Sequence, residues 1–407
     1  MRTLIISALV MLAGLAIGEW QSVGPEGGPI YCGVVAAGGA AIYVAPSLSS
    51  TPLLRTTNGG TNWTLAGAAL STYPWNMAAH PTDPNTLFGV VSGVFYRTTN
   101  AGATWSQVSL GTNTVGYDLA VNPKNPQVIY VACYKSNGTV WQISLAKSTN
   151  AGTTWTTTFV DTISTANGYA YSCAIDPVDT TRVYVGGYSG NRTAFFRSTD
   201  CGATWTRIEF PSNAYYIYSL FVSPTDNNTL FAGTLYGVWR STDAGLTWAK
   251  QSTGNYNYRI VAVPGEPNVM YSSCLSTVQK STDAGSTWAN VGPGLVGTTI
   301  RAVLTVPGEN STVYAGSTAG MFKSTDYGAS WTAVNSGILI GKIPAIAFVP
   351  GTPGSAWAEF MDNAIFKTTD DGDNWTRQTS PLSCGNICNI AFDPTDPQRV
   401  WMFEGSG

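Results

Sequence analysis

One eight-residue phrase occurs eight times along the chain, and this repetition constrains the fold more than any other feature. Each copy begins with Ser or Thr, has Asn or Asp third and Gly fifth, and ends with Trp, as in Ser281–Trp288. We call this phrase the box turn. The tryptophans of successive box turns are 40 to 50 residues apart. Units of that length, copied many times, are typical of solenoids and of the four-stranded blades of propellers.

The residues of the box turn predict a hairpin that is stabilised by its own side chains. An Asn or Asp oxygen can accept backbone N–H bonds inside a turn, and Gly adopts conformations that other residues resist. The Trp can anchor the turn to apolar surface beneath it. The predicted acceptors, one per repeat, are Asn58, Asn100, Asn150, Asp200, Asp243, Asp283, Asp326 and Asp370.

A second phrase lies between successive box turns and allows the strands of one repeat to be predicted. It is an apolar run that ends in Pro, such as Cys173–Pro177, followed by a Val/Tyr run, such as Val183–Val185. An unbroken apolar run predicts a strand buried on both faces, as an innermost blade strand would be. A third strand such as Gly237–Arg240 leads into the box turn, and a fourth begins at its Trp. We therefore predict an all-β β-propeller of four-stranded blades, with eight complete repeats and a partial ninth.

The two ends of the chain carry further expectations. A short basic start, an apolar run and small residues near position 18 predict that residues 1–18 are a signal peptide and that 19–407 form the propeller. The mature protein is then secreted, to an extracellular, periplasmic or cell-surface location, with no second apolar run of membrane length. Trp20–Val23 and the strands after the last box turn could share the ninth blade and close the ring. Otherwise closure is imperfect or the reading frame ends early at Gly407, and the second of these is favoured.

Composition excludes several classes of partner. Charged residues are 11% of the chain and the net charge is −3, which gives no basic field for nucleic acid. His80 is the one histidine of the sequence, so a His-rich metal site is excluded and no metal or cofactor is expected.

With these residues in view, the chain resembles the Asp-box, or bacterial neuraminidase repeat (BNR), propellers. The Ser/Thr-x-Asp-x-Gly-x-Thr-Trp phrase carries the resemblance, which covers nearly all of the mature chain. The added Asn/Asp-Pro phrase is most similar to the sortilin-type and xyloglucanase-type branch of the sialidase-like superfamily. The resemblance implies a propeller whose box turns are structural and lie away from the ligand face.

The candidate binding site comes from aligning the repeats on the Pro. Residues six positions earlier are expected at the mouth of the central channel, where aromatic rings with polar tips suit sugar rings or extended peptides. Neighbouring loops add further tyrosines. The alternative is that these rings only cap the core. With one adjacent arginine, the candidate residues are Trp75, Tyr117, Tyr171, Tyr218, Tyr258, Arg259 and Arg301.

Catalysis by glycoside hydrolysis is the alternative function, and no catalytic residue can be assigned. A sialidase needs three arginines, a tyrosine nucleophile and acidic groups. A xyloglucanase-type enzyme needs two facing carboxylates. One catalytic Asp of that family sits in an Arg-Thr-Asp phrase early in the chain, and the nearest match here, Arg55-Thr-Thr-Asn58, has no carboxylate. The other candidates for either reaction are Arg192, Asp118, Asp161, Glu209, Glu359 and Asp362. We therefore expect a binding module, with no committed enzymatic role, for a polysaccharide or an extracellular protein.

Overall fold

The computed structural model describes most of the chain between residues 28 and 404. The described residues are 28–46, 52–67, 70, 74–161, 167–211, 213–292, 295, 299–336, 345–350, 352–360, 364–370, 375–378, 387–392 and 399–404. The predicted signal peptide and Trp20–Val23 lie outside these ranges. In the described part the structure is all-β, with one short 3-10 turn, η1 (Ala37–Gly39), between the first two strands.

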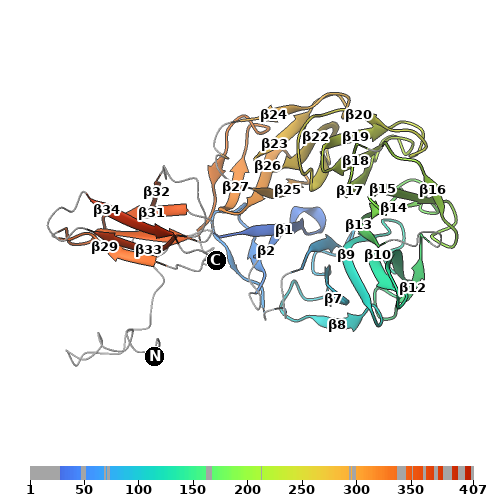
Figure 1. Cartoon of the computed structure of the whole chain (residues 1–407), viewed down its shortest axis with the longest axis horizontal. Helices are drawn as coiled ribbons and strands as arrows, with labels where there is room; N and C mark the ends of the chain where they lie inside the picture. The colour runs from blue at the N-terminus through green and yellow to red at the C-terminus, as the bar shows by residue number, and fades with distance from the viewer. Residues whose placement is uncertain are drawn as a thin grey trace.

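Eight sheets have four antiparallel strands each, and every sheet uses four strands that are consecutive in sequence. Seven of these sheets form a ring (Figure 1). The innermost strands of the ring are β1 (Ile30–Val35), β5 (Asn76–Ala79), β9 (Thr114–Val121), β13 (Gly168–Ile175), β17 (Ile217–Val222), β21 (Arg259–Val263) and β25 (Ile300–Val306). The second strands are β2 (Ile42–Pro46), β6 (Leu87–Val91), β10 (Ile129–Ser136), β14 (Val183–Ser189), β18 (Leu230–Thr234), β22 (Glu266–Cys274) and β26 (Glu309–Ser317).

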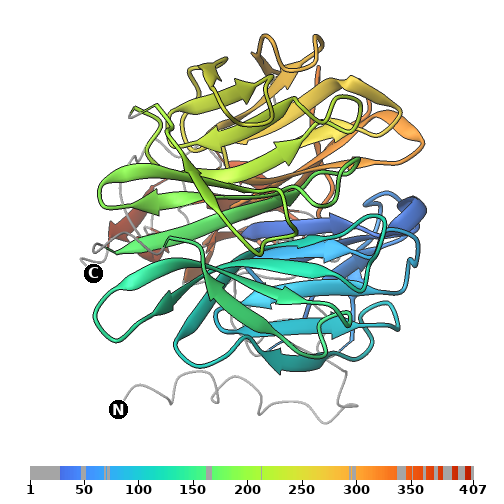
Figure 2. The same ribbon diagram turned by 90° about the vertical axis from the view of Figure 1, so that its right-hand side faces the viewer.

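The outer half of each ring sheet is built in the same order. The third strands are β3 (Leu54–Thr56), β7 (Val94–Thr98), β11 (Trp141–Ser148), β15 (Arg192–Ser198), β19 (Gly237–Ser241), β23 (Thr277–Ser281) and β27 (Gly320–Ser324). The fourth strands are β4 (Thr64–Leu65), β8 (Ser106–Ser109), β12 (Thr156–Phe159), β16 (Thr206–Ile208), β20 (Ala249–Lys250), β24 (Ala289–Val291) and β28 (Thr332–Ala333). Figure 2 shows these twisted sheets from the side of the ring.

The order of strands within a repeat is as predicted. Burial differs from the expectation of an innermost strand buried on both faces. Innermost strands such as β21 are only partly buried, whereas a second strand such as β18 is buried along its whole length, because the neighbouring sheets cover both of its faces. The innermost strands contact one another in sequence around the ring, from β1 through β25. The all-β propeller with eight four-stranded repeats and a two-stranded ninth sheet is therefore confirmed.

The closure of the ring differs from the expected shared blade. β1 packs on β25, so the first and seventh sheets are neighbours. The eighth sheet and the two-stranded ninth stand beside the ring (Figure 1). They consist of β29 (Ala345–Phe348), β30 (Ala356–Phe360), β31 (Ala364–Thr368), β32 (Thr376–Gln378), β33 (Ile387–Phe392) and β34 (Val400–Glu404). The expectation that the ninth sheet closes the ring is wrong, because β1 packs directly on β25. Whether Trp20–Val23 adds a strand to the ninth sheet lies outside the described residues.

The box turns have the hydrogen bonds that the sequence predicts. In one of them Ser281 Oγ donates to Asp283 Oδ1 (2.7 Å), and the Gly285 N–H donates to Ser281 Oγ (2.9 Å). The Thr287 N–H donates to the same Asp283 Oδ1 (2.9 Å). Asn in place of Asp keeps these bonds, as at Asn150, whose Oδ1 accepts from the Thr154 N–H at 2.9 Å. The turn therefore depends on the acceptor oxygen and does not need a negative charge.

The box turns of the seven ring sheets also rest on the preceding sheet. Tyr43 on β2 donates its hydroxyl to the Ala101 carbonyl of the next sheet's box turn (3.1 Å), and Tyr130 on β10 donates to the Cys201 carbonyl (2.9 Å). At the point of closure, Lys323 on β27 donates to the Gly59 carbonyl of the first box turn (3.1 Å). The first and seventh sheets are therefore joined by the same kind of contact as the other sheets.

Candidate functional site

A β-bulge in the innermost strands directs one side chain per sheet toward the central channel. In β13, Ala170 pairs with Gly187 and Ser172 pairs with Gly186, which leaves Tyr171 without a partner in the ladder. A bulged residue of this kind is turned away from the regular alternation of the strand. The same register shift leaves an extra residue in four more innermost strands of the ring, namely Tyr31, Tyr117, Tyr218 and Arg301.

The other two sheets of the ring reach the same arrangement at the start of the strand. Trp75 directly precedes β5 and donates its backbone N–H to the Val90 carbonyl (3.0 Å). Tyr258 directly precedes β21 and donates its N–H to the Ser273 carbonyl (3.3 Å). Each of the seven sheets thus contributes one residue to the channel mouth. We call this set the channel ring: Tyr31, Trp75, Tyr117, Tyr171, Tyr218, Tyr258 and Arg301.

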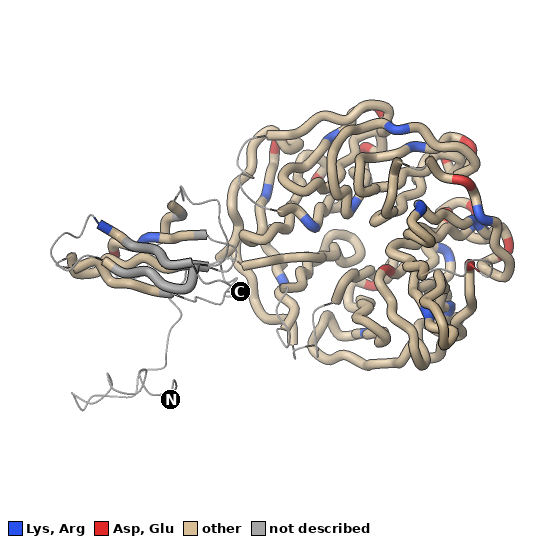
Figure 3. The backbone as a smooth tube through the Cα atoms, viewed as in Figure 1, with Lys and Arg blue, Asp and Glu red and all other residues tan. Residues whose placement is uncertain are grey.

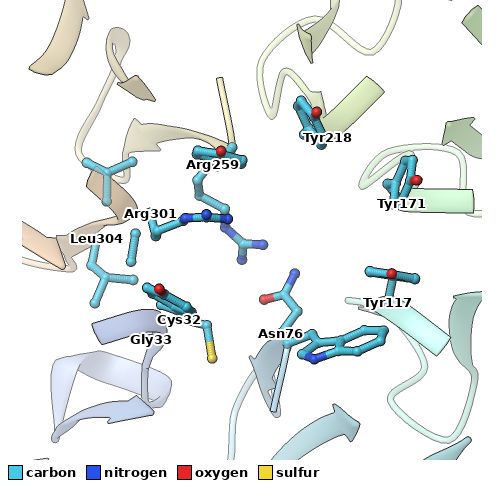
Figure 4. A pocket seen from close by; sticks show the side chains of 14 residues that line it. Cys32, Gly33, Asn76, Tyr117, Tyr171, Tyr218, Arg259, Arg301 and Leu304 are labelled. Carbon is cyan, nitrogen blue, oxygen red and sulfur yellow. The ribbon is translucent and has the colours of Figure 1, made fainter. Parts of the chain in front are cut away.

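The channel ring surrounds a cavity of about 460 Å³. All seven residues that the sequence singled out line this cavity, including Arg259, which follows Tyr258. Tyr31 was missed because no Pro follows the first innermost strand, so the alignment on Pro did not include it. Figure 4 shows Arg259 and Arg301 reaching toward the middle of the cavity, with Tyr117, Tyr171 and Tyr218 on the opposite side.

The rings of the channel ring contact one another in an almost complete circuit. The ring centroids of Trp75 and Tyr117 are 4.1 Å apart, and those of Tyr117 and Tyr171 are 5.1 Å apart at an interplanar angle of 82°. Tyr218 lies 5.9 Å from Tyr171 and 5.3 Å from Tyr258. Such offset and edge-to-face pairs are favourable and hold aromatic rings in fixed positions. The walls of the cavity are therefore preorganised.

Arg301 takes the place of an aromatic residue in this circuit. Its guanidinium carbon lies 4.3 Å from the ring centroid of Tyr258 and 4.9 Å from that of Tyr31. A guanidinium over an aromatic face is attracted to the negative face of the ring. The seventh sheet thus supplies a positive charge where five others supply tyrosine and one supplies tryptophan.

A second group of aromatic residues surrounds the channel ring on the sheets β9–β24. Tyr216 contacts Tyr171, Tyr188 and Tyr218, with centroid distances of 5.9, 4.5 and 5.6 Å. Tyr256 stands 6.1 Å from Tyr218 and is 36% exposed. Burial raises the pKa of Tyr171 and Tyr218, so their hydroxyls stay neutral and can donate hydrogen bonds.

A layer of polar residues lies next to the channel ring, one position further along the chain on six of the seven ring sheets; the seventh has Ala302 there. Asp118 is buried, and its carboxylate oxygens accept from the Asn76 side-chain amide, the Leu119 N–H (2.9 Å), the Ser172 hydroxyl (2.8 Å) and the Cys173 N–H (3.0 Å). Burial raises the pKa of Asp118, and the charge of Arg259 acts in the opposite direction. The sequence analysis named Asp118 and Arg259 singly but did not find the layer, because its bonds run between sheets.

The remaining acidic and basic candidates lie away from the cavity or outside the described side chains. Asp161 is buried and pairs with Arg207 at 3.2 Å. Arg192 and Glu209 are exposed and do not line the cavity. The side chain of Glu359 and the whole of Asp362 lie outside the described residues. Of the residues proposed for a sialidase, the structure therefore brings together Arg259, Arg301 and Tyr258, with Asp118 behind them in the adjacent polar layer, and leaves Arg192, Asp161 and Glu209 away from the cavity.

Comparison with known proteins supports the architecture. No family model matches the sequence, and no curated protein matches it. Among solved structures, an ancestral GH74 enzyme superposes with a TM-score of 0.62 at 16% identity, over 95% of this chain and 68% of that one. YCF48 from Cyanidioschyzon merolae superposes with a TM-score of 0.55 at 14% identity, over 74% of this chain and 97% of that one. The chain shares the β-propeller fold. At these identities the likeness shows the fold alone.

Two negative findings apply to the described residues. They contain no group of three or more His, Cys, Asp or Glu side chains placed to hold a metal ion. They also contain no helix of the length and apolar character needed to cross a membrane.

Charged residues are sparse, and both signs are interspersed around the ring (Figure 3).

Proposed function

We propose that this chain is a binding module that takes part of a polysaccharide or of an extracellular protein into the mouth of its central channel. The observation that carries the proposal is the channel ring, in which seven sheets each contribute one side chain to a single cavity. Pockets of this kind combine apolar walls with a few polar groups that fix the orientation of the ligand. The aromatic contacts keep the walls in place before the ligand arrives.

The composition of the cavity favours binding over hydrolysis. No Asp or Glu is among the described residues that line it. Asp118 is the adjacent acid, and its raised pKa is a feature that a general acid would share. Its oxygens, however, accept four hydrogen bonds from the protein, and glycoside hydrolysis needs a second carboxylate facing the first. A glycoside hydrolase therefore remains the second candidate.

The test is a binding screen with purified protein on labelled polysaccharides, sialosides and peptides, in which retention and product release are scored together. Tyr171→Ala and Tyr218→Ala should each weaken retention of the ligand that wild type binds. Tyr327→Ala is the matched control, because this tyrosine is the fourth residue of a box turn. Two other box turns have alanine at that position, Ala244 and Ala284, with a similar positive φ. Unchanged retention in both ring variants would overturn the proposal, and product release without retention would favour the hydrolase.

Two further parts of the proposal concern family and location. The hydrogen bonding that repeats from one box turn to the next supports placing the chain with the Asp-box propellers of the sortilin-type and xyloglucanase-type branch. The amino-terminal sequence supports export with removal of residues 1–18. Sequencing of the amino terminus of the mature protein should start at Glu19, and a protein that keeps Met1 inside the cell would contradict export.

A further inference from the structure

The polar layer beside the channel ring links the sheets in series. Cys32 Sγ contacts the Pro74 carbonyl (3.1 Å), and Asn76 donates to Asp118. Continuing around the ring, Ser172 accepts from the Leu220 N–H at 2.9 Å, and Ser219 accepts from the Ile260 N–H at 3.2 Å. These hydrogen bonds account for the polar residues of the layer on the first five sheets.

Arg259 occupies the same position on the sixth sheet but is not used in this way. Within the described part of the chain its guanidinium has no hydrogen bond and no ion pair, although it is only partly exposed. Figure 4 shows it extending into the cavity. A guanidinium carries five donors in a planar fork and keeps its charge at any ordinary pH. The fork is therefore available to a ligand.

Arg301 adds a second guanidinium to the same cavity. Its Nε is buried and has no hydrogen-bond partner in the protein. Tyr258 and Tyr31 flank the group, and both also line the cavity. The charge of Arg259 acts on Asp118, but that carboxylate is engaged by its own four donors and forms no ion pair with either arginine. Among the described residues that line the cavity, the two positive charges face no Asp or Glu.

We infer that the cavity binds an acidic sugar unit of a polysaccharide, with the acid group on Arg259 and Arg301 and the sugar ring against the tyrosines. The inference rests on the proposed binding function and specifies its ligand. A planar carboxylate, as in a hexuronic acid, matches the guanidinium fork, and a sulfate ester offers the same anionic chemistry. An aromatic wall tipped with hydroxyls suits a cyclic unit that has both an apolar face and hydroxyl groups. An acidic peptide side chain offers the charge without such a face.

The volume of the cavity agrees with a ligand of this size. Small-molecule sites span roughly 300–1,000 Å³, and this cavity of about 460 Å³ lies toward the lower end of that range. It therefore holds a single unit or a short end of a polymer, while the neighbouring tyrosines, such as Tyr216 and Tyr256, can contact the units that follow.

The experiment is isothermal titration of the full-length protein with four probes. These are a galacturonic acid oligosaccharide, a neutral galactose oligosaccharide of the same length, a sulfated galactose oligosaccharide and an oligoglutamate peptide. The inference expects at least one acidic oligosaccharide to bind more tightly than the neutral one, with a preference that decreases at high salt. The two acidic sugars distinguish carboxylate from sulfate as the recognised group.

Variants then connect the preference to the two arginines. Arg259→Gln should lower the affinity for the preferred acidic sugar about 10- to 100-fold, the effect of losing hydrogen bonds to a charged group, and leave the neutral sugar nearly unaffected. Arg301→Gln should act in the same direction, and Arg259→Lys should retain part of the preference. Arg182→Gln is the matched control, because Arg182 pairs with Asp179 in a loop at the other end of the strands. Circular dichroism verifies that each variant is folded.

The failures are distinguishable. If no oligosaccharide binds and Tyr171→Ala changes nothing in any assay, the proposed function itself is wrong. If wild type binds acidic and neutral sugars equally, if oligoglutamate binds best, or if folded Arg259→Gln keeps the preference, the inference is wrong while the binding function stands.

Discussion

The guanidinium of Arg301 lies 4.3 Å from the ring of Tyr258, across the boundary between the sixth and seventh sheets. This contact joins two sheets through side chains that line the cavity. It makes Arg301 a residue that stabilises the fold as well as a candidate anion-binding residue.

Replacement of Arg301 by Met should therefore destabilise the protein even without ligand. Loss of the contacts with Tyr258 and Tyr31 is expected to lower the free energy of unfolding by about 0.5–2 kcal/mol, the range for cation–π pairs. Urea denaturation followed by tryptophan fluorescence measures this. Arg301→Lys should lose less, because it keeps the charge. A stability equal to that of wild type in the Met variant would show that the stacking is not energetically significant.

The box-turn glycine should be required for two separable reasons. Gly285 has φ +75°, and a Cβ there would lie 2.1 Å from a ring carbon of Phe231 in the preceding sheet. Gly308 has φ +82° with no atom within 4 Å of such a Cβ. Gly308→Ala should therefore cost about 1 kcal/mol from backbone strain alone, and Gly285→Ala clearly more because of the added steric clash. Equal costs in denaturant unfolding would mean that Phe231 moves aside freely.

The charged box turns should make the protein sensitive to acid. Hydrogen bonds from the turn lower the pKa of Asp200, Asp283 and Asp326 to about 2. The unfolded value is about 3.9, so the folded state binds protons less readily than the unfolded state. The resulting stabilisation is present above about pH 4 and is lost as the pH falls toward 2.

The matched variants replace each of these aspartates with Asn, the residue found in the first three box turns. The triple variant should remain folded at neutral pH and should lose less stability than wild type between about pH 5 and about pH 2. Denaturant midpoints across that range give the comparison. Parallel acid profiles for the two proteins would indicate that other carboxyl groups control acid unfolding.

Ser172 should contribute more to the stability of the protein than an exposed serine, because its hydroxyl forms hydrogen bonds to both neighbouring sheets. Its hydroxyl donates to Asp118 and accepts from the Leu220 N–H. Ser172→Ala leaves a buried N–H without a partner, which is expected to cost about 1–3 kcal/mol. Ser106→Ala is the control, since its exposed hydroxyl bonds only to the Arg97 carbonyl. Similar unfolding free energies for the two variants would show that water replaces Ser172.

Most of the fold could be predicted from the sequence because the structure of the repeated unit is determined by local sequence patterns. The apolar run, the Val/Tyr run and the box turn each determine a strand or a turn through local chemistry, and together they account for the eight four-stranded sheets. The number of sheets in the ring was not predictable in the same way. It depends on the packing of β1 against β25, which no local pattern records.

Most of the candidate site was also predictable from a local pattern, the distance of each residue to the Pro. The prediction was incomplete where that pattern is missing. Six of the seven members of the channel ring were found from their distance to the Pro, since each lies six residues before it, four of them at a bulge and two directly before the strand. Tyr31 was missed because its strand leads into η1 and not into a Pro turn. The partners of Asp118 and Ser172 could not be predicted, because they come from neighbouring sheets.

The seam between the first and last sheets of the ring involves no exchanged strand, since each sheet is made of consecutive strands and Lys323 reaches Gly59 much as Lys147 reaches Cys201. The order in which the blades are connected by the polypeptide is therefore not what holds the circle together. A gene rearranged to begin at another blade, with the present chain ends joined, would encode the same contacts between blades. The chain ends could therefore lie elsewhere without altering the cavity that the channel ring surrounds.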